Sequence, residues 1–532
     1  MKRRKFIQNT AAGVVVPSLI NGLSVQAYSN PSLLQNLFAP GVDTDHVLVL
    51  IYLGGGNDGL NTLIPLDQYA NYVTARPNIY LNTNSLLPLN GQSKVALHPA
   101  MKGFQTLYNE NKLNIVQSVG YPNPDYSHFR STDIWTSGAD SNQVLSTGWL
   151  GRYLNTEYPG FPLNYPNAKD PDPLAVQVGA NYPLLFQGPN AQMSMNVSNP
   201  DIFGAWPNGI DDPATNDNYG KELDFIRTIG RQSKSYADAL LNSYIKGVNV
   251  ANYPAGNYLA DILKAIARII NGGLKTRLYL VSLYGFDTHS DQVMVGNKTT
   301  GVHANLLQSL SDAVLAFQRD LEGLRLDDRV LGMTFSEFGR RIKDNVSGAN
   351  GAGGTDHGAA APVFLFGKNV QPGIIGANPI IPSIVNEYDN IPMQYDFRSV
   401  YNSVLQNWFC VKDPALTEIL IKKYQDLPIV KKSNCITDTT DLNTLNDTID
   451  IQIYPNPLVD RVTIQTKVID GYASIQLISP MGVVVKTIYK GKLNAGSHAF
   501  DLENEQYPSG NYYVRIQQGP AQKTIPLMVL KP

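Results

Sequence analysis

The stretch Val47-Leu-Val-Leu-Ile-Tyr-Leu53 is an uninterrupted apolar run that leads into Gly54-Gly-Gly-Asn-Asp58. A strand covered by helices on both faces has this composition, because neither of its two rows of side chains meets water. The glycines that follow indicate a tight turn at the end of the strand. The run therefore predicts a buried strand of an α/β sheet, with the Asp58 carboxylate close to its carboxyl end.

Two later apolar runs end in the same way. Residues 278–283 lead into Gly285-Phe-Asp287-Thr-His289, and residues 330–335 lead into Ser336-Glu337-Phe-Gly-Arg340. Between these runs an apolar stripe with helical spacing comprises Leu306, Leu310, Val314, Phe317 and Leu321. Strand, helix and strand in this order predict a doubly wound mixed sheet flanked by helices, in which ligands collect at the carboxyl edge.

A further pair of candidate residues lies in Gly353-Gly-Thr-Asp356-His357-Gly358, just before the apolar run 361–366. The chain has only seven histidines, so a histidine in a glycine-rich loop is informative. Crowded carboxylates repel one another unless a cation offsets their charge, and Asp and His are common metal ligands. We therefore predict a site for one or two divalent ions, Zn²⁺, Mn²⁺, Mg²⁺ or Ca²⁺. The predicted ligands are Asp58, Asp287, His289, Glu337, Asp356 and His357.

Each of these residues also has a purely structural interpretation. Asp58 could cap a helix that begins near Leu60, and Glu337 could pair with one of the two arginines at 340 and 341. Asp287 and His289 could be ordinary turn residues. The glycine run at 54–59 lacks the Gly-Lys-Ser/Thr ending of a phosphate-binding loop and the spacing of a dinucleotide-binding loop, which excludes both.

The segment Asp125-Tyr-Ser127-His128-Phe-Arg130 is the predicted source of a nucleophile. Metal coordination would lower the pKa of the Ser127 hydroxyl, and Arg130 or His128 would hold an anionic oxygen of the substrate. An ordered loop in the wall of a pocket is the alternative interpretation of the same segment.

Composition limits the class of protein. The chain has 532 residues, of which 43% are hydrophobic and 16% charged, and its net charge is −2. A length of this size suits one large α/β domain and a small module. The absence of a basic stripe argues against a nucleic-acid partner, and no segment is long and apolar enough to predict a membrane helix. Cys410 and Cys435 could form a disulfide or remain two thiols.

The two ends of the chain indicate export. Lys2-Arg-Arg-Lys-Phe-Ile-Gln8, followed by a short apolar stretch, resembles a twin-arginine signal over residues 1–27. Residues 429–449 are polar and predict a linker, and the alternating segments in 450–532 predict a small all-β sandwich. Within it, Tyr454-Pro-Asn-Pro457 and Gly510-Asn-Tyr-Tyr513 resemble the C-terminal sorting domain of the type IX secretion system. The two resemblances imply both export machineries, passage through the periplasm, and a secreted or surface-attached protein.

The central region 28–428 resembles the domain-of-unknown-function 1501 family, within the alkaline-phosphatase-like fold group. The motifs around Asp58, Ser127-His128-Phe-Arg130, Asp287-Thr-His289, Phe335-Ser-Glu-Phe-Gly-Arg340, Asp356-His357 and Asp396-Phe-Arg-Ser-Val-Tyr401 carry the resemblance. It implies that Asp58 and the Asp356-His357 pair serve one metal and that Asp287 and His289 serve another.

Two departures from the phosphatases of this group and one from its sulfatases stand out. The middle pair of the phosphatases is spaced Asp-x-x-x-His, they use a third, later histidine, and here only His498 follows His357. The Cys/Ser-x-Pro-x-Arg motif of sulfatases does not occur around Cys410 or Cys435. The retained Asp356-His357 pair and Asp58 nevertheless lead us to expect an exported metal-dependent hydrolase of phosphate or sulfate esters, such as those of a polysaccharide or lipid, whereas the missing third histidine favours the alternative. The alternative is a catalytically inactive surface protein that binds a glycan or assembles with envelope proteins.

Overall fold

The computed structural model describes residues 45–530 except 164, 180–182, 198–217, 346–352, 432–449, 469–470, 480–483, 505–506 and 519–520. The chain divides into two compact units, residues 1–435 and 436–532. The predicted signal at 1–27, most of the predicted linker and Cys435 lie outside the described residues. Cys410 is fully buried.

The first unit is built on a mixed sheet whose strand order is β13-β5-β12-β9-β1-β8-β6-β7, with β14 beside β5. Strand β1 (Val47–Gly54) is buried along its whole length and pairs in parallel with β8 (Leu278–Tyr284) and β9 (Val330–Phe335). Strand β12 (Ala361–Phe366) is antiparallel to β9 and to β5 (Leu113–Gly120). The remaining strands of this sheet are β6 (Ala175–Val178), β7 (Met195–Val197), β13 (Gly373–Ile375) and β14 (Tyr395–Asp396).

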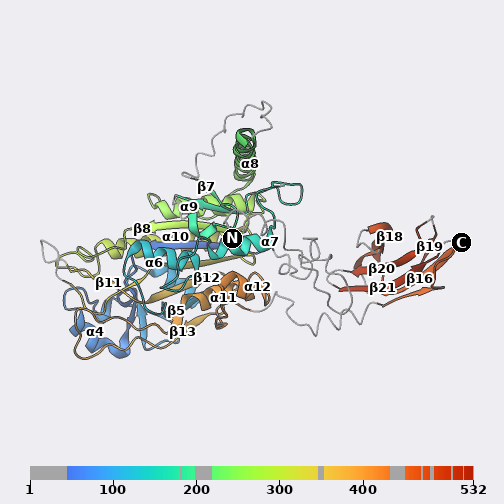
Figure 1. Ribbon diagram of the computed structural model, residues 1–532. Coiled ribbons are helices and arrows are strands. Elements are labelled where there is room, and N and C mark those ends of the chain that lie inside the picture. The colour runs from blue at the N-terminus through green and yellow to red at the C-terminus, as the bar shows by residue number, and fades with distance from the viewer. Residues whose placement is uncertain are drawn as a thin grey trace, which may run out of the picture. The chain divides into compact units, whose positions relative to one another are not determined.

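Helices cover both faces of the sheet (Figure 1). Val49 and Ile51 of β1 belong to one core cluster, whereas Leu48 and Leu50 belong to the other, as the alternation of strand side chains requires. The first cluster includes residues of α5 (Lys102–Asn109), α9 (Tyr258–Asn271) and α10 (Val302–Gly323). The second includes residues of α6 (His128–Ser137), α7 (Trp149–Glu157), α11 (Phe397–Asn407) and α12 (Ala415–Leu420). The predicted α/β class with a mixed sheet is confirmed.

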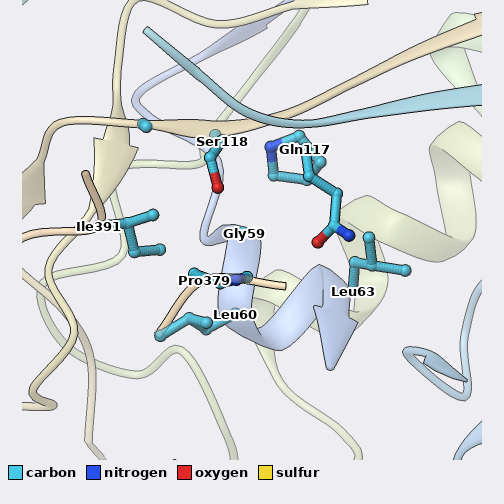
Figure 2. Close-up of a pocket in the computed structure, with 10 residues that line it drawn as sticks. Gly59, Leu60, Leu63, Gln117, Ser118, Pro379 and Ile391 are labelled. Atoms are coloured by element: carbon cyan, nitrogen blue, oxygen red, sulfur yellow. The ribbon is translucent and has the colours of Figure 1, made fainter. Parts of the chain in front are cut away.

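Short elements build the loops at the carboxyl edge and the neighbouring surface. They are α3 (Gly59–Thr62), β2 (Leu63–Pro65), α4 (Tyr69–Ala75), β3 (Leu87–Pro88), β4 (Val95–Leu97), β10 (Gly339–Arg340) and β11 (His357–Gly358). The long helix α8 (Asn218–Lys246) precedes α9. Helix α3 packs beside Gln117 and Ser118 of β5 around a small cavity, which contains none of the predicted site residues (Figure 2). Among the described residues, no helix has both the length and the apolar content that crossing a membrane requires.

The glycines after β1 allow two other loops to approach closely. Gly55 and Gly56 have φ values of +119° and +89°, which residues with side chains rarely adopt. A Cβ atom on Gly55 would lie 2.3 Å from the amide nitrogen of Asp287. On Gly56 it would lie 2.5 Å from the Phe338 ring. The glycine run therefore allows the loops that follow β8 and β9 to lie close to the end of β1.

The second unit consists of two antiparallel sheets that share one apolar core. One contains β15 (Asp450–Tyr454), β16 (Arg461–Val468) and β19 (Gly496–Glu503). The other contains β17 (Gly471–Ile478), β18 (Val484–Leu493), β20 (Gly510–Gln518) and β21 (Ala521–Val529). Buried and exposed residues alternate along β16, and the predicted all-β module is confirmed.

Two buried histidines of the first unit predict sensitivity to acid. Burial lowers the pKa of His98 to about 3 and that of His303 to about 4. An unfolded histidine has a pKa of about 6.5, so below that pH the unfolded chain binds more protons than the folded one. The stability that the two neutral, buried histidines contribute is therefore fully present above about pH 6.5. As the pH drops toward about 4, the free energy of unfolding falls by up to about 1.4 kcal/mol per pH unit for each histidine.

The variant His98→Asn isolates one of these groups. The Nδ1 atom of His98 accepts a hydrogen bond from the amide of Ala100 at 3.1 Å, and an asparagine oxygen can replace this acceptor. All four tryptophans lie in the first unit, so urea denaturation followed by tryptophan fluorescence reports on it. Between about pH 7.5 and about pH 5, we expect the variant to lose about 2 kcal/mol less stability than the wild type. Equal losses would contradict the prediction.

Candidate metal centre

Four side chains from separate parts of the sequence meet at the carboxyl edge of the central sheet. Asp287 and His289 follow β8, His128 begins α6 after β5, and His357 lies in β11, which pairs with β10. We call these four residues the His-Asp cluster. Because β1, β8 and β9 are parallel, the loops after them emerge on the same edge, which is why the prediction of convergence there was possible.

The cluster centres on the carboxylate of Asp287. The Nε2 atoms of His289 and His357 are 2.9 Å apart, and each lies 3.1 Å from Oδ1 of Asp287. The Nε2 atom of His128 lies 3.4 Å from Oδ2. His128, Asp287 and His357 each offer a ligand atom, and these atoms lie within 4.8 Å of one another. The ligand atoms of His128, Asp287 and His357 thus lie close enough together to hold a metal ion, and the Nε2 atom of His289 lies beside those of Asp287 and His357.

An oxygen atom lies within hydrogen-bond distance of Nδ1 in each of the three rings, on the side away from the cluster. Nδ1 of His128 lies 2.8 Å from Oε1 of Glu337, and Nδ1 of His289 lies 2.9 Å from Oδ1 of Asp356. Nδ1 of His357 lies 2.7 Å from the main-chain oxygen of Tyr126. These oxygens can only accept, so we assign the ring proton to Nδ1 in each histidine, which leaves a lone pair on Nε2. This is the arrangement of metal-binding histidines.

Charges around the cluster keep Asp287 ionised. Burial works against its negative charge, but the Arg340 guanidinium, 2.7 Å from Oδ1, outweighs this effect and lowers the pKa of Asp287 to about 2. A hydrogen bond with Glu337 raises the pKa of His128, whereas burial lowers the pKa of His357. Imidazole lone pairs separated by 2.9 Å repel one another unless a cation or a proton lies between them. The residues present therefore fit a divalent cation.

Arg340 joins the loops that carry the cluster. Its guanidinium is fully buried and donates to the main-chain oxygens of Gly55, Gly56, Phe286 and Thr355, in addition to Asp287. Arg341 donates to the main-chain oxygens of His357 and Glu387. Glu337 is bound instead by the amide of Gly55 and by His128. Among the described residues, Glu337 therefore pairs with His128 and forms no ion pair with Arg340 or Arg341.

Asp58 lies outside the cluster, in a buried ion pair. Nη1 of Arg76 contacts its two carboxylate oxygens at 2.8 and 2.7 Å, and Nε2 of Gln292 donates to Oδ2 at 2.6 Å. Burial opposes the ionisation of Asp58, but Arg76 outweighs it and lowers its pKa. Asp58 is also the residue before α3, without a capping hydrogen bond from its side chain. Its predicted role as a metal ligand remains a prediction.

The predicted nucleophile segment separates into three different positions. Ser127 is the N-cap of α6, and its Oγ accepts a hydrogen bond from the amide of Arg130. The Arg130 guanidinium donates to the main-chain oxygens of residues 140, 141 and 143. Of these three side chains, only that of His128 belongs to the cluster. The catalytic roles of Ser127 and Arg130 remain predictions, because in the described part of the chain neither side chain forms a hydrogen bond or ion pair with the cluster.

A cavity of about 530 Å³ opens beside the cluster. Its lining includes His128, Asp287 and Glu337, so a ligand in the cavity would contact the cluster directly. The other lining residues are Tyr52, Gly54, Gly55, Phe129, Thr132, Asp133, Tyr284 and Gly285. This volume is typical of small-molecule sites.

Comparison with known proteins supports two of the three predicted resemblances, and the twin-arginine signal stays a prediction. Residues 265–402 match the family described as "Protein of unknown function (DUF1501)". The DUF1501 match contains Asp287, His289 and His357 but begins after His128. Residues 452–530 match "Secretion system C-terminal sorting domain". The protein is therefore secreted or attached to the cell surface, and its tail implies the type IX export machinery.

Solved structures show weak similarity. A protein in the alkaline phosphatase superfamily from Vibrio parahaemolyticus is 10% identical, with 91% of this chain and 80% of that chain covered and a TM-score of 0.31. The PsFucS1 sulfatase from Pseudoalteromonas sp. is 10% identical, with coverage of 90% and 87% and a TM-score of 0.30. PorZ of Porphyromonas gingivalis, a surface component of the type-IX secretion system, is 18% identical, and the chain covers 13% of its length, at a TM-score of 0.13. The match covers 19% of this chain. No curated protein matches the chain.

The sequence did not reveal how the roles divide within the predicted set. His128 was predicted as a catalytic group, but it lies among the nitrogens of the cluster, while Glu337 and Asp356 support histidines. The Tyr126 main-chain oxygen carries no sequence signal, because any residue supplies one. The sequence could have pointed to His128 if the third histidine had been sought before Asp287 as well as after His357.

Proposed function

We propose that the protein is an exported metal-dependent hydrolase that acts on phosphate or sulfate esters. The observation that carries the proposal is that the Nε2 atoms of three histidines lie around the Asp287 carboxylate, beside a cavity. An oxygen atom accepts a hydrogen bond from Nδ1 of each of these histidines. Three neutral imidazoles and one carboxylate form a ligand set used by Zn²⁺ and other transition metals. Mg²⁺ and Ca²⁺ prefer sets of oxygen ligands, so Zn²⁺ or Mn²⁺ is the proposed ion.

One ion fits these residues better than two. The carboxylates that would have served a second ion have other partners: Asp58 binds Arg76, Asp356 binds His289 and Asn345, and Glu337 binds His128. His128, Asp287, His289 and His357 are the proposed ligands. His128 thus supplies the third histidine that the later part of the chain lacks.

The residues around the ion have separable roles in the proposed reaction. A bound divalent cation supplies Lewis acidity toward the ester oxygen and lowers the pKa of a bound water. Glu337 and Asp356 hold the rings of His128 and His289 at Nδ1. Arg340 forms an ion pair with Asp287, and because its guanidinium is buried it would not contact the substrate. Since Ser127 caps α6, we propose water as the nucleophile.

A binding role is the second candidate, and one observation favours it. No lysine or arginine is among the residues that line the cavity, whereas enzymes that transfer phosphoryl groups commonly hold the charged group with cationic side chains or additional metals. A protein that binds a ligand through one metal and the cavity would need no such group.

Metal analysis and an activity panel distinguish the two candidates. The full mature chain is purified, its metal content is measured by mass spectrometry, and aryl phosphates, phosphodiesters and aryl sulfates are tested with Zn²⁺, Mn²⁺ or Ca²⁺ added. We expect one equivalent of bound metal and hydrolysis that a chelator removes and the metal restores. Stoichiometric metal with no hydrolysis would favour the binding role, and the absence of bound metal after incubation with each ion would refute both.

A further inference from the structure

We propose that the cavity beside the His-Asp cluster binds a pyranose ring of a glycan, whose ester group then reaches the metal. This inference rests on the proposed function and specifies its substrate class. It starts from two aromatic side chains in the cavity lining that remain open to solvent. Phe129 is 87% exposed and Tyr284 is 53% exposed, although apolar surface of this size is normally buried.

The fold holds both rings at the cavity. Phe129 follows His128 in the first turn of α6, so the histidine at the cluster and the exposed ring are fixed by the same helix start. Tyr284 ends β8 opposite Gly54, and its ring meets the Tyr52 ring edge to face at 6.2 Å. A Cβ atom on Gly54 would lie 2.6 Å from Cδ1 of Tyr284. Glycine at position 54 therefore makes room for this ring.

Polar groups accompany the rings in the same lining. Thr132 and Asp133 lie three and four residues after Phe129 in α6, which places them on the same side of the helix. The Thr132 hydroxyl lies 3.2 Å from the Tyr52 hydroxyl, and Asp133 is exposed. The cavity thus presents aromatic faces together with a carboxylate and hydroxyls.

This combination favours a sugar over other occupants. A pyranose has an apolar face of C–H bonds that packs on an aromatic ring, and hydroxyls around its edge that donate to a carboxylate. A lipid chain would leave the Asp133 carboxylate in contact with hydrocarbon, which is unfavourable. A polyanionic chain such as a nucleic acid would meet this carboxylate and no lysine or arginine of the lining.

A glycan array tests the inference. The full mature chain is applied to an array of neutral, sulfated and phosphorylated oligosaccharides, in the presence of Zn²⁺ and, separately, of a chelator. We expect retention on at least one glycan class, and loss of affinity by about tenfold for Phe129→Ala and for Tyr284→Ala, the scale of one aromatic contact. Tyr513→Ala is the control, because this exposed tyrosine belongs to the second unit. It should leave retention unchanged.

The outcomes separate this inference from the proposed function. Chelator-sensitive hydrolysis of aryl esters with no retained glycan, or with retention unaffected by both ring substitutions, would refute the sugar site and leave the hydrolase in place. Retention that depends on the rings, without hydrolysis of any ester, would refute the hydrolase and support a sugar-binding site. Preferential binding to vesicles of anionic lipid, unaffected by competing oligosaccharide, would also overturn the sugar site.

Discussion

The variant His289→Ala should lose its stoichiometric metal and, with it, any metal-dependent hydrolysis. The Nε2 atom of this histidine lies within 3.1 Å of both His357 and Asp287, so the substitution removes one of the four proposed ligands. Since outer partners of metal ligands already contribute about 10- to 100-fold to metal affinity, a ligand should contribute more than about 100-fold. Metal content after dialysis, measured by mass spectrometry, checks the expectation.

The fold should tolerate this substitution. Asp356 loses the His289 ring but keeps the side-chain amide of Asn345 at 2.8 Å, and its carboxylate is partly exposed, so no buried charge is stranded. The control is His498→Ala in the second unit, which should keep one equivalent of metal. A full equivalent of tightly held metal in His289→Ala would exclude this residue as a ligand.

Glu337 provides a graded comparison in the same experiment. The Glu337→Gln variant keeps an oxygen that can accept from His128 Nδ1 and from the Gly55 amide, but it loses the charge that orients the ring. We expect its metal affinity to fall by about 10- to 100-fold while binding remains measurable. A loss as complete as that of His289→Ala would instead indicate that Glu337 is itself a ligand, as the sequence predicted.

The strands were predictable because their physics is local. The apolar run of β1 and the turns after β1, β8 and β9 each mark an element and its carboxyl end, and parallel pairing brings those ends to one edge. The direction of β12 was not predictable in this way. About two dozen residues join β9 to β12, and such a connection is long enough for either direction. Only tertiary packing decides that β12 lies antiparallel between β5 and β9.

The roles of the site residues were harder to predict than their meeting place. Residue type and position placed Asp287, His289 and His357 at the edge, but which atom faces inward depends on contacts across the loops. Asp356 and His357 are adjacent in sequence, yet His357 presents Nε2 to the cluster, whereas Asp356 holds the far side of His289. Asp58 forms a buried ion pair with Arg76. No spacing rule connects these two residues, so the sequence could not predict this pair.

The variant Arg76→Met should be the most destabilising substitution near the site. Arg76 is fully buried and neutralises Asp58, which is itself 1% exposed. It also donates to the main-chain oxygens of Arg341 and Ile342, which join α4 to the loop after β10. Removal of one partner of a buried ion pair costs about 3–5 kcal/mol, because the remaining charge keeps its desolvation penalty without compensation. Urea denaturation followed by tryptophan fluorescence measures this loss.

The double variant Arg76→Met/Asp58→Asn tests the cause of that loss and the role of Asp58 together. Removal of the stranded charge should recover much of the lost stability, since asparagine can still accept from Gln292. Gln292 in turn accepts hydrogen bonds from the hydroxyls of Thr288 and Thr355, which are adjacent in sequence to His289 and Asp356. The Asp58–Arg76 ion pair is therefore linked to the loops that carry the cluster. If Asp58 is only a structural partner of Arg76, the double variant keeps one equivalent of metal. Loss of metal in a folded double variant would indicate that Asp58 is a metal ligand. A loss of less than about 1 kcal/mol in the free energy of unfolding of Arg76→Met would contradict a stabilising role for the buried ion pair.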